Sequence, residues 1–156
     1  MQIATARTSE AFETMSNIKA PLPRGNETIL VVDDDPHCID VIRELLTMFG
    51  YQIISAASGE EAIHLYETYR NEQTGGKIDL IIIDVFMSGM SGIDAIRKIT
   101  GKSPDVKFLM NSGLFLDGEE KYEPYVSLMS LGCRGFMRKP FTLTMLAILV
   151  RSALDG

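Results

Sequence analysis

Residues 28–37 read TILVVDDDPH, which is an apolar run followed by three consecutive aspartates and a proline. The run at 28–32 has the length and the continuous apolar character of a strand covered on both faces of a parallel sheet. Asp35 and Pro36 are typical of a helix N-cap and of the first residue of a helix. The stretch therefore predicts a buried strand that leads into a helix, with two further aspartates at the strand end.

Strand and helix patterns alternate along the rest of the chain. Apolar runs predict strands at 28–32, 52–56, 79–84, 106–111 and 135–137. Helical patterns follow them at 36–49, at 58–69, at 93–99, within 120–131 and at 142–154. Five strand–helix pairs with short connections predict an α/β fold of the doubly wound, flavodoxin-like kind. Its five-stranded parallel sheet has the expected order 2-1-3-4-5, with helices on both faces.

The composition favours a single domain with no direct nucleic-acid or membrane partner. The 156 residues are 46% hydrophobic, which suffices for one core. The formal charge of -6 and the lack of a basic run oppose nucleic-acid binding. No apolar run approaches the roughly 18 residues of a membrane span, and the N-terminus lacks a signal-peptide pattern. Cys38 and Cys133 lack CxxC spacing and are expected to be reduced thiols, which suits a cytoplasmic location.

The N-terminal part of the chain differs from the rest. Residues 1–26 contain Ser, Thr, Pro and Gly with little apolar periodicity, a pattern that predicts a flexible tail or linker. The folded domain is expected to span residues 27–156.

Polar side chains gather at one predicted edge of the sheet. Asp33 and Asp34 end the first strand, and Asp84 ends the third. Ser112 lies at the end of the fourth strand, and Lys139 follows the fifth. In a doubly wound sheet, ligands bind outside the carboxyl ends of the strands, where the strand order reverses. Three carboxylates this close need a compensating cation, and such oxygen ligands suit Mg²⁺.

Each of these residues, taken alone, also has a purely structural explanation. Asp35 is expected to be only the helix cap, with metal binding as the alternative. Asp33 and Asp34 could be solvated loop acids, and Lys139 could be an ordinary surface lysine. Serine is common in loops, so Ser112 alone indicates nothing. The combination, and no single member, favours a metal site.

The chain from Glu27 to Leu154 resembles the receiver domain of two-component response regulators. The resemblance rests on four stretches whose order and spacing match that family. They are ILVVDDDP (29–36), DLIIIDVFMSGMSG (79–92), FLMNSG (108–113) and GCRGFMRKPF (132–141).

The resemblance implies a phosphoacceptor site. Asp84 would accept a phosphoryl group from a histidine kinase or a histidine phosphotransfer protein. Asp34 and Asp84 would bind Mg²⁺ directly, together with the backbone carbonyl of Phe86, and Asp33 would act through a water molecule. Lys139 would be the lysine that this family places beside the phosphoryl group.

The resemblance also implies a conformational switch. Ser112 would bond the phosphoryl group, and Phe136 would be the aromatic residue that changes position with it. The affected surface would comprise the fourth helix, the fifth strand and the fifth helix, which would contact a downstream protein or a second copy in a phosphorylation-linked homodimer. The chain would be a signalling phosphoacceptor and not an enzyme acting on a metabolite, either as a single-domain regulator or as the receiver part of a hybrid sensor kinase.

Two departures from the family pattern stand out. Ser88 occupies the turn after Asp84 where the family usually has a proline. The segment between Ser112 and Lys139 is several residues longer than usual, which affects the expected position of the fourth helix.

Two rival classes share parts of this pattern. A hydrolase of the haloacid-dehalogenase type would also use Asp84 as a nucleophile, but it needs a second acid two residues on, where Phe86 stands. A flavin-binding protein would share the sheet order, but it needs a phosphate-cradling loop after the first strand, and DDDP has the wrong charge for that. A yellow colour would favour the flavin, and turnover of a phosphodonor without a covalent intermediate would favour the hydrolase.

Overall fold

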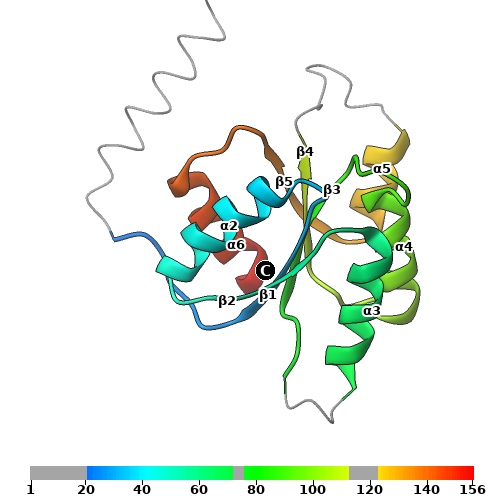
Figure 1. The fold of residues 1–156 in the computed structure, drawn as a ribbon, viewed down its shortest axis with the longest axis horizontal. Coiled ribbons are helices and arrows are strands. Elements are labelled where there is room, and N and C mark those ends of the chain that lie inside the picture. The colour runs from blue at the N-terminus through cyan, green and yellow to red at the C-terminus, as the bar shows by residue number, and fades with distance from the viewer. Residues whose placement is uncertain (1–20, 72–75, 113–122) are drawn as a thin grey trace, which may run out of the picture.

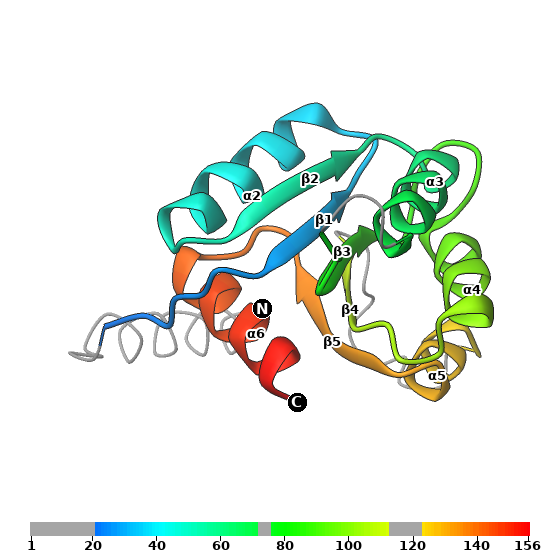
Figure 2. The same cartoon turned by 90° about the horizontal axis from the view of Figure 1, so that it is seen from below.

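The computed structural model describes residues 21–71, 76–112 and 123–156. Its five parallel strands have the order β2-β1-β3-β4-β5, which confirms the predicted doubly wound, flavodoxin-like sheet. Figure 2 shows this order in a view from below. The strands are β1 (Thr28–Val32), β2 (Gln52–Ala56), β3 (Leu80–Asp84), β4 (Phe108–Ser112) and β5 (Cys133–Arg138).

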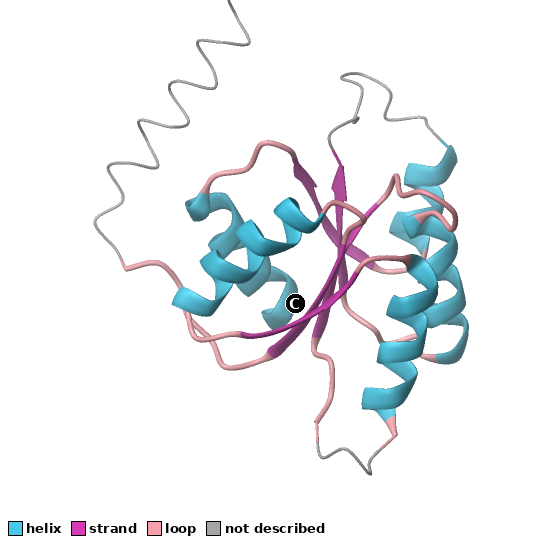
Figure 3. Ribbon diagram, in the orientation of Figure 1, coloured by secondary structure: helices cyan, strands magenta, loops and turns pink. Residues whose placement is uncertain are grey.

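Helices cover both faces of this sheet (Figures 1 and 3). One face carries α2 and α6, and the other carries α3, α4 and α5. The bounds are α2 (Pro36–Met48), α3 (Gly59–Arg70), α4 (Gly92–Lys102), α5 (Glu123–Ser130) and α6 (Leu143–Asp155). None of the helices in the described ranges is long and apolar enough to cross a membrane.

Two hydrophobic layers hold the helices to the sheet. The first core cluster lies under α2 and α6 and includes Ile29, Val31, Leu80, Ile82, Leu109 and Met137 from the strands. The second core cluster lies under α3, α4 and α5 and includes Leu30, Val32, Ile81, Ile83, Phe108 and Met110. Neighbouring residues of a strand alternate between the two layers because successive side chains point to opposite faces. This alternation decides which side chains share a face at the strand ends.

The helix starts follow the capping residues found in the sequence. The Asp35 carboxylate accepts a hydrogen bond from the N–H of His37, and Pro36 opens α2. Ser58 accepts from the N–H of Glu61, while the Glu61 carboxylate accepts from Ala57, the residue before the cap. The second half of the predicted capping box therefore reaches one residue further back than expected.

The predicted ends of three strands differ from the observed ones, and β3 begins one residue late, at Leu80 and not at Asp79. β4 begins at Phe108 and not at Val106, which lies in the preceding loop and donates its N–H to Ser103. β5 runs over Cys133–Arg138, although only 135–137 were predicted. This strand lies at the sheet edge, so the exposed Arg134 and Arg138 interrupt the apolar pattern by which a strand is recognised.

Residues 21–26, which the sequence analysis assigns to the tail, lie against the domain; residues 1–20 are outside the described part. Leu22 packs against the first core cluster, and the N–H of Gly25 donates to the carbonyl of Phe49 at 3.0 Å. Gly50 follows with a φ of 98°, and a Cβ there would come within 2.4 Å of the Gly25 carbonyl oxygen. Gly50 thus lets the chain turn after α2 and leaves room for residues 21–27, which we call the leading segment.

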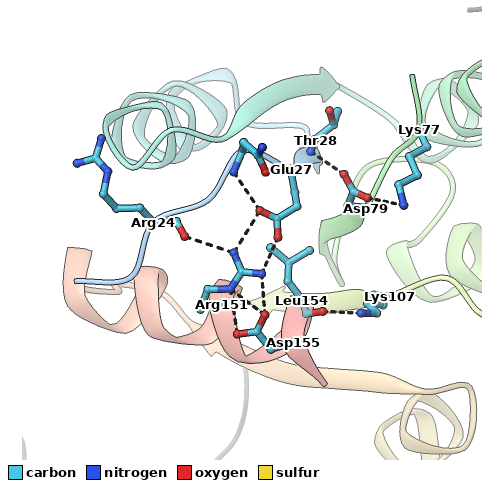
Figure 4. A network of polar contacts seen from close by, with 10 residues as sticks. Arg24, Glu27, Thr28, Lys77, Asp79, Lys107, Arg151, Leu154 and Asp155 are labelled. Carbon is cyan, nitrogen blue, oxygen red and sulfur yellow. Dashed lines mark hydrogen bonds and ion pairs between the residues drawn. The ribbon is translucent and has the colours of Figure 1, made fainter. Parts of the chain in front are cut away.

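Arg151 of α6 fastens this leading segment (Figure 4). Its guanidinium donates to both carboxylate oxygens of Glu27, at 3.1 and 2.6 Å, and to the carbonyl of Arg24 at 3.4 Å. It also bonds Asp155 one turn further along α6. These bonds hold the pKa of Glu27 below its usual value, so the pair stabilises the fold at neutral pH and loses this effect when Glu27 is protonated in acid.

Replacing Arg151 should therefore weaken the attachment of the leading segment to α6 and lower the stability of the domain. We expect Arg151→Met to lower the free energy of unfolding by about 1–2 kcal/mol, because it removes several charge-assisted hydrogen bonds at a partly buried site. Arg97→Met is the matched control, since the Arg97–Asp94 pair is exposed and its atoms are 3.9 Å apart. Urea unfolding at pH 7 measures both; equal losses in the two variants would contradict this role of Arg151.

Candidate functional site

Three carboxylates meet at the carboxyl ends of β1 and β3. One oxygen each from Asp33, Asp34 and Asp84 lies within 4.8 Å of the others. Asp33 and Asp84 are buried, with 1% and 7% of their surface exposed, whereas Asp34 is exposed. The two buried acids continue the face of the first core cluster, because each lies two residues beyond a strand residue of that cluster.

Lys139, which follows the edge strand β5, reaches this group of acids on the same face of the sheet. Its ammonium nitrogen is 2.9 Å from Oδ2 of Asp33 and 3.2 Å from Oδ2 of Asp84. Burial alone would lower the pKa of Lys139, but the hydrogen bonds and negative charges of the two aspartates outweigh it and raise that pKa. Lys139 is therefore a permanent cation, and the four groups together keep a negative excess.

Backbone donors orient the three carboxylates. The N–H of Asp35 donates to Asp33, that of Phe86 donates to Asp84, and that of Ser88 donates to Asp34. The bond from Ser88 lowers the pKa of Asp34. Burial raises the pKa of Asp84, against the opposing effects of the Phe86 N–H and Lys139. An added cation would offset this effect of burial at Asp84.

Gly92 allows the loop after β3 to close tightly around Asp84. A Cβ at this position would lie 1.9 Å from the carbonyl oxygen of Asp84. The N–H of Gly92 donates to the carbonyl of Val85 at 3.1 Å, which anchors the start of α4 at the strand end. Only glycine permits this approach, so the MSGMSG stretch has a structural function even though the family's proline is replaced by Ser88.

The donor set of the site fits Mg²⁺. It consists of hard carboxylate oxygens on short side chains, with room for water on the exposed Asp34 side. The nearby Cys38 does not compete as a ligand, because burial and the adjacent Asp33 raise the pKa of its thiol to about 11. Asp33, Asp34 and Asp84 are the side chains that would hold the ion.

The remaining predicted residues belong to the carboxyl ends of β4 and β5 and to the loop after β3. Ser112 is the last residue of β4 and pairs in register with Arg138, but its side chain lies outside the described part of the structure. Phe136 is partly buried against the second core cluster. The side chain of Phe86 is 52% exposed beside the crevice. Of the predicted longer segment, residues 113–122 also lie outside the described residues.

The sequence analysis missed one polar residue at this edge. Asn111 is 1% exposed and lies beside Asp84 in the register of β3 and β4. It interrupts an apolar strand, and an amide in a strand carries no motif by which it could have been recognised.

A doubly wound sheet with three acids and a lysine at its carboxyl edge is the arrangement that the resemblance to receiver domains implied. The family model of the response regulator receiver domain matches residues 29–151. The chain belongs to this family, and receiver domains bind Mg²⁺ at the acidic pocket.

Several known proteins resemble the chain. It is 33% identical over 135 residues to the sensor kinase CckA of Brucella abortus (strain 2308), covering 84% of the chain and 13% of the kinase. It is 35% identical over 130 residues to the transcriptional regulatory protein YvrH of Bacillus subtilis (strain 168), covering 83% and 49%. The response regulator TrrA of Thermotoga maritima, solved in complex with Mg²⁺-BeF, superposes with a TM-score of 0.65 at 29% identity, covering 82% of the chain and 99% of that structure.

Binding of Mg²⁺ should raise the melting temperature. A ligand that binds only the folded state adds about 1.4 kcal/mol to the free energy of unfolding at ten times its Kd. The effect should shrink as the pH falls, beginning above the range of an ordinary aspartate, because the pKa of Asp84 is raised and protonation removes a ligand charge.

Thermal melting with and without Mg²⁺ measures this effect. Asp84→Asn should weaken it, while Asp105→Asn, at an exposed aspartate before β4, should leave it unchanged. A melting temperature that does not respond to excess Mg²⁺ would rule out the metal site.

Proposed function

We propose that the chain accepts a phosphoryl group from a histidine kinase or a histidine phosphotransfer protein onto Asp84. The observation that carries this proposal is the ammonium of Lys139, held between Asp33 and Asp84 inside a crevice with excess negative charge. A nucleophilic carboxylate, a fixed cation and a set of metal ligands are the parts that phosphoryl transfer requires.

In the transfer, an oxygen of Asp84 attacks the phosphorus of the phosphohistidine. The P–O bond forms as the P–N bond breaks, and the electron pair returns to the imidazole nitrogen. Lys139 offsets the charge on the phosphoryl oxygens, and the N–H of Phe86 orients the Asp84 carboxylate. Mg²⁺, held by Asp34, Asp84, the carbonyl of Phe86 and, through water, Asp33, would neutralise further charge on the transferred group.

The acyl phosphate on Asp84 would act as a switch. Ser112 would donate its hydroxyl to the phosphoryl group, and the ring of Phe136 would turn into the space beside β4. Full burial of such a ring is worth about 2 kcal/mol, enough to shift a population without locking one state. Exposed Val126 and Met129 on α5 support an output surface near this helix, β5 and α6.

The relatives also support proposals about the larger protein to which the domain belongs and about its partner. The chain spans 13% and 49% of the two curated relatives described above, so it could work as a free regulator or as the receiver part of a hybrid sensor kinase. The downstream partner would be a protein or a second copy of this chain. The free thiols of Cys38 and Cys133 support a reducing, cytoplasmic location.

The rival activities have less support in this crevice. Phe86 occupies the position where a hydrolase of the haloacid-dehalogenase type needs its second acid, and buried Asp33 opposes a flavin phosphate at the end of β1. The domain would therefore catalyse only its own phosphorylation and dephosphorylation.

Intact-mass measurement after incubation with acetyl phosphate and Mg²⁺ tests the proposal. The wild type should gain one phosphoryl group, and the gain should fall sharply when Mg²⁺ is chelated. Asp84→Asn should gain none, whereas Asp40→Asn, at an exposed site on α2, should be labelled like the wild type. Labelling of Asp84→Asn at the wild-type rate would show that another residue is the acceptor.

Amide hydrogen exchange tests the switch. Beryllofluoride with Mg²⁺, a mimic of the phosphoryl group, should change exchange in the described parts of α5 and β5, in addition to the loops around Asp34 and Asp84. In Phe136→Ala the changes at α5 should disappear while those in the loops remain. If the wild type changes only in the loops, the output surface lies elsewhere.

A further inference from the structure

Asn111 is a buried polar residue whose side chain is only partly satisfied. It is 1% exposed, and its Oδ1 atom accepts no hydrogen bond from any described residue. Within the described ranges, the Tyr51 hydroxyl is the other buried side-chain group in this condition. An unsatisfied buried carbonyl destabilises a fold, so its presence calls for an explanation.

The strand pattern places Asn111 on the face of the acidic crevice. Leu109, two residues earlier in β4, belongs to the first core cluster, and side chains alternate along a strand. Asp84 on β3 and Met137 on β5 are its partners in register, on the same face. Asn111 therefore occupies the β4 position between Asp84 on β3 and β5, the strand that Lys139 directly follows.

The side chain of Lys139 has to pass over this position. It starts just beyond β5 and reaches Asp84 on β3, so it crosses β4, a span of two strand spacings of about 4.8 Å each. At the level of Asp84, Asn111 is the β4 residue on that face. Asp33 and Asp84 each occupy one N–H of the ammonium, which has three donors.

A packing explanation does not require an amide here. The nearest residues of the same face on β4 and β5 are Leu109 and Met137, both buried and apolar. An apolar residue at 111 would continue this layer without leaving an acceptor unsatisfied. The amide is thus costly for folding at this position.

We propose that Asn111 is a positioning residue for Lys139 in the phosphotransfer reaction, which makes this inference dependent on the proposed function. As the P–O bond forms in the transition state, negative charge moves from the Asp84 carboxylate to the phosphoryl oxygens, and the hold of Asp84 on Lys139 weakens. The Oδ1 atom of Asn111 then accepts the third N–H of the ammonium and keeps it above β4, directed at the phosphoryl oxygens. An acceptor at 111 lowers the barrier by fixing the cation where charge develops.

Two variants of equal shape isolate the acceptor. Asn111→Val removes it, and Asn111→Thr restores an oxygen in a side chain of the same outline, so both change the packing alike. Labelling by acetyl phosphate at saturating Mg²⁺ should slow at least about tenfold in the valine variant, the loss expected for one hydrogen bond to a charged group, and much less in the threonine variant. Tyr51→Phe, which removes the other unsatisfied group, should be labelled like the wild type.

Melting temperature and Mg²⁺ affinity should be measured for the same variants as the labelling rates. The valine variant should melt no lower than the threonine variant and bind Mg²⁺ equally well, which a merely structural role would not give. Equal rates in the wild type and Asn111→Val, or equal slowing in the valine and threonine variants, would overturn the inference and leave the proposed function intact. Absence of labelling in the wild type would overturn both.

Discussion

The contact on which the carboxyl edge of the sheet depends is the one between Lys139 and its two buried aspartates. Lys139 lies 106 residues from Asp33 and 55 from Asp84 along the chain, so only the completed strand order brings them together. A buried carboxylate without a partner is strongly unfavourable, and two side by side are worse. The ammonium makes their burial tolerable, and burial in turn holds the ammonium in one place.

The balance of acidic and basic side chains differs between the amino and carboxyl ends of the strands. At the amino edge, Arg151, Lys77 and Lys107 accompany Glu27, Asp79 and Asp155, so three basic side chains balance three acids, and Arg151 fastens the leading segment (Figure 4). At the carboxyl edge, a single lysine faces three carboxylates and leaves a negative excess. Such an imbalance weakens the folded state unless a cation arrives, as expected at a binding site and not at a structural one.

How much the sequence could predict depended on how local the signal was. β1 and β2 were predicted with their observed ends, because continuous apolar runs and flanking caps are visible in the chain. The ends of β5 were missed, since an edge strand with exposed Arg134 has no such run. The convergence of Asp33 and Asp84 followed from the strand order. Asn111 could not be recognised, because its place beside Asp84 depends on the register between β3 and β4, which the sequence of one strand does not show.

The end of β5 links the charge of the crevice to the helices. Lys139 lies on the face of the first core cluster, while Phe136, three residues earlier, packs against the second. Lys139 directly follows the last residue of β5, so the end of this strand places a cation in the crevice, while Phe136 within the strand packs toward the α5 side. β5 is hydrogen-bonded to described strands only along β4 and lies at the sheet edge, where a small displacement disturbs few other pairs. If phosphorylation of Asp84 shifts the ammonium, as proposed above, β5 is the strand through which that shift would reach α5, where Val126 and Met129 are exposed.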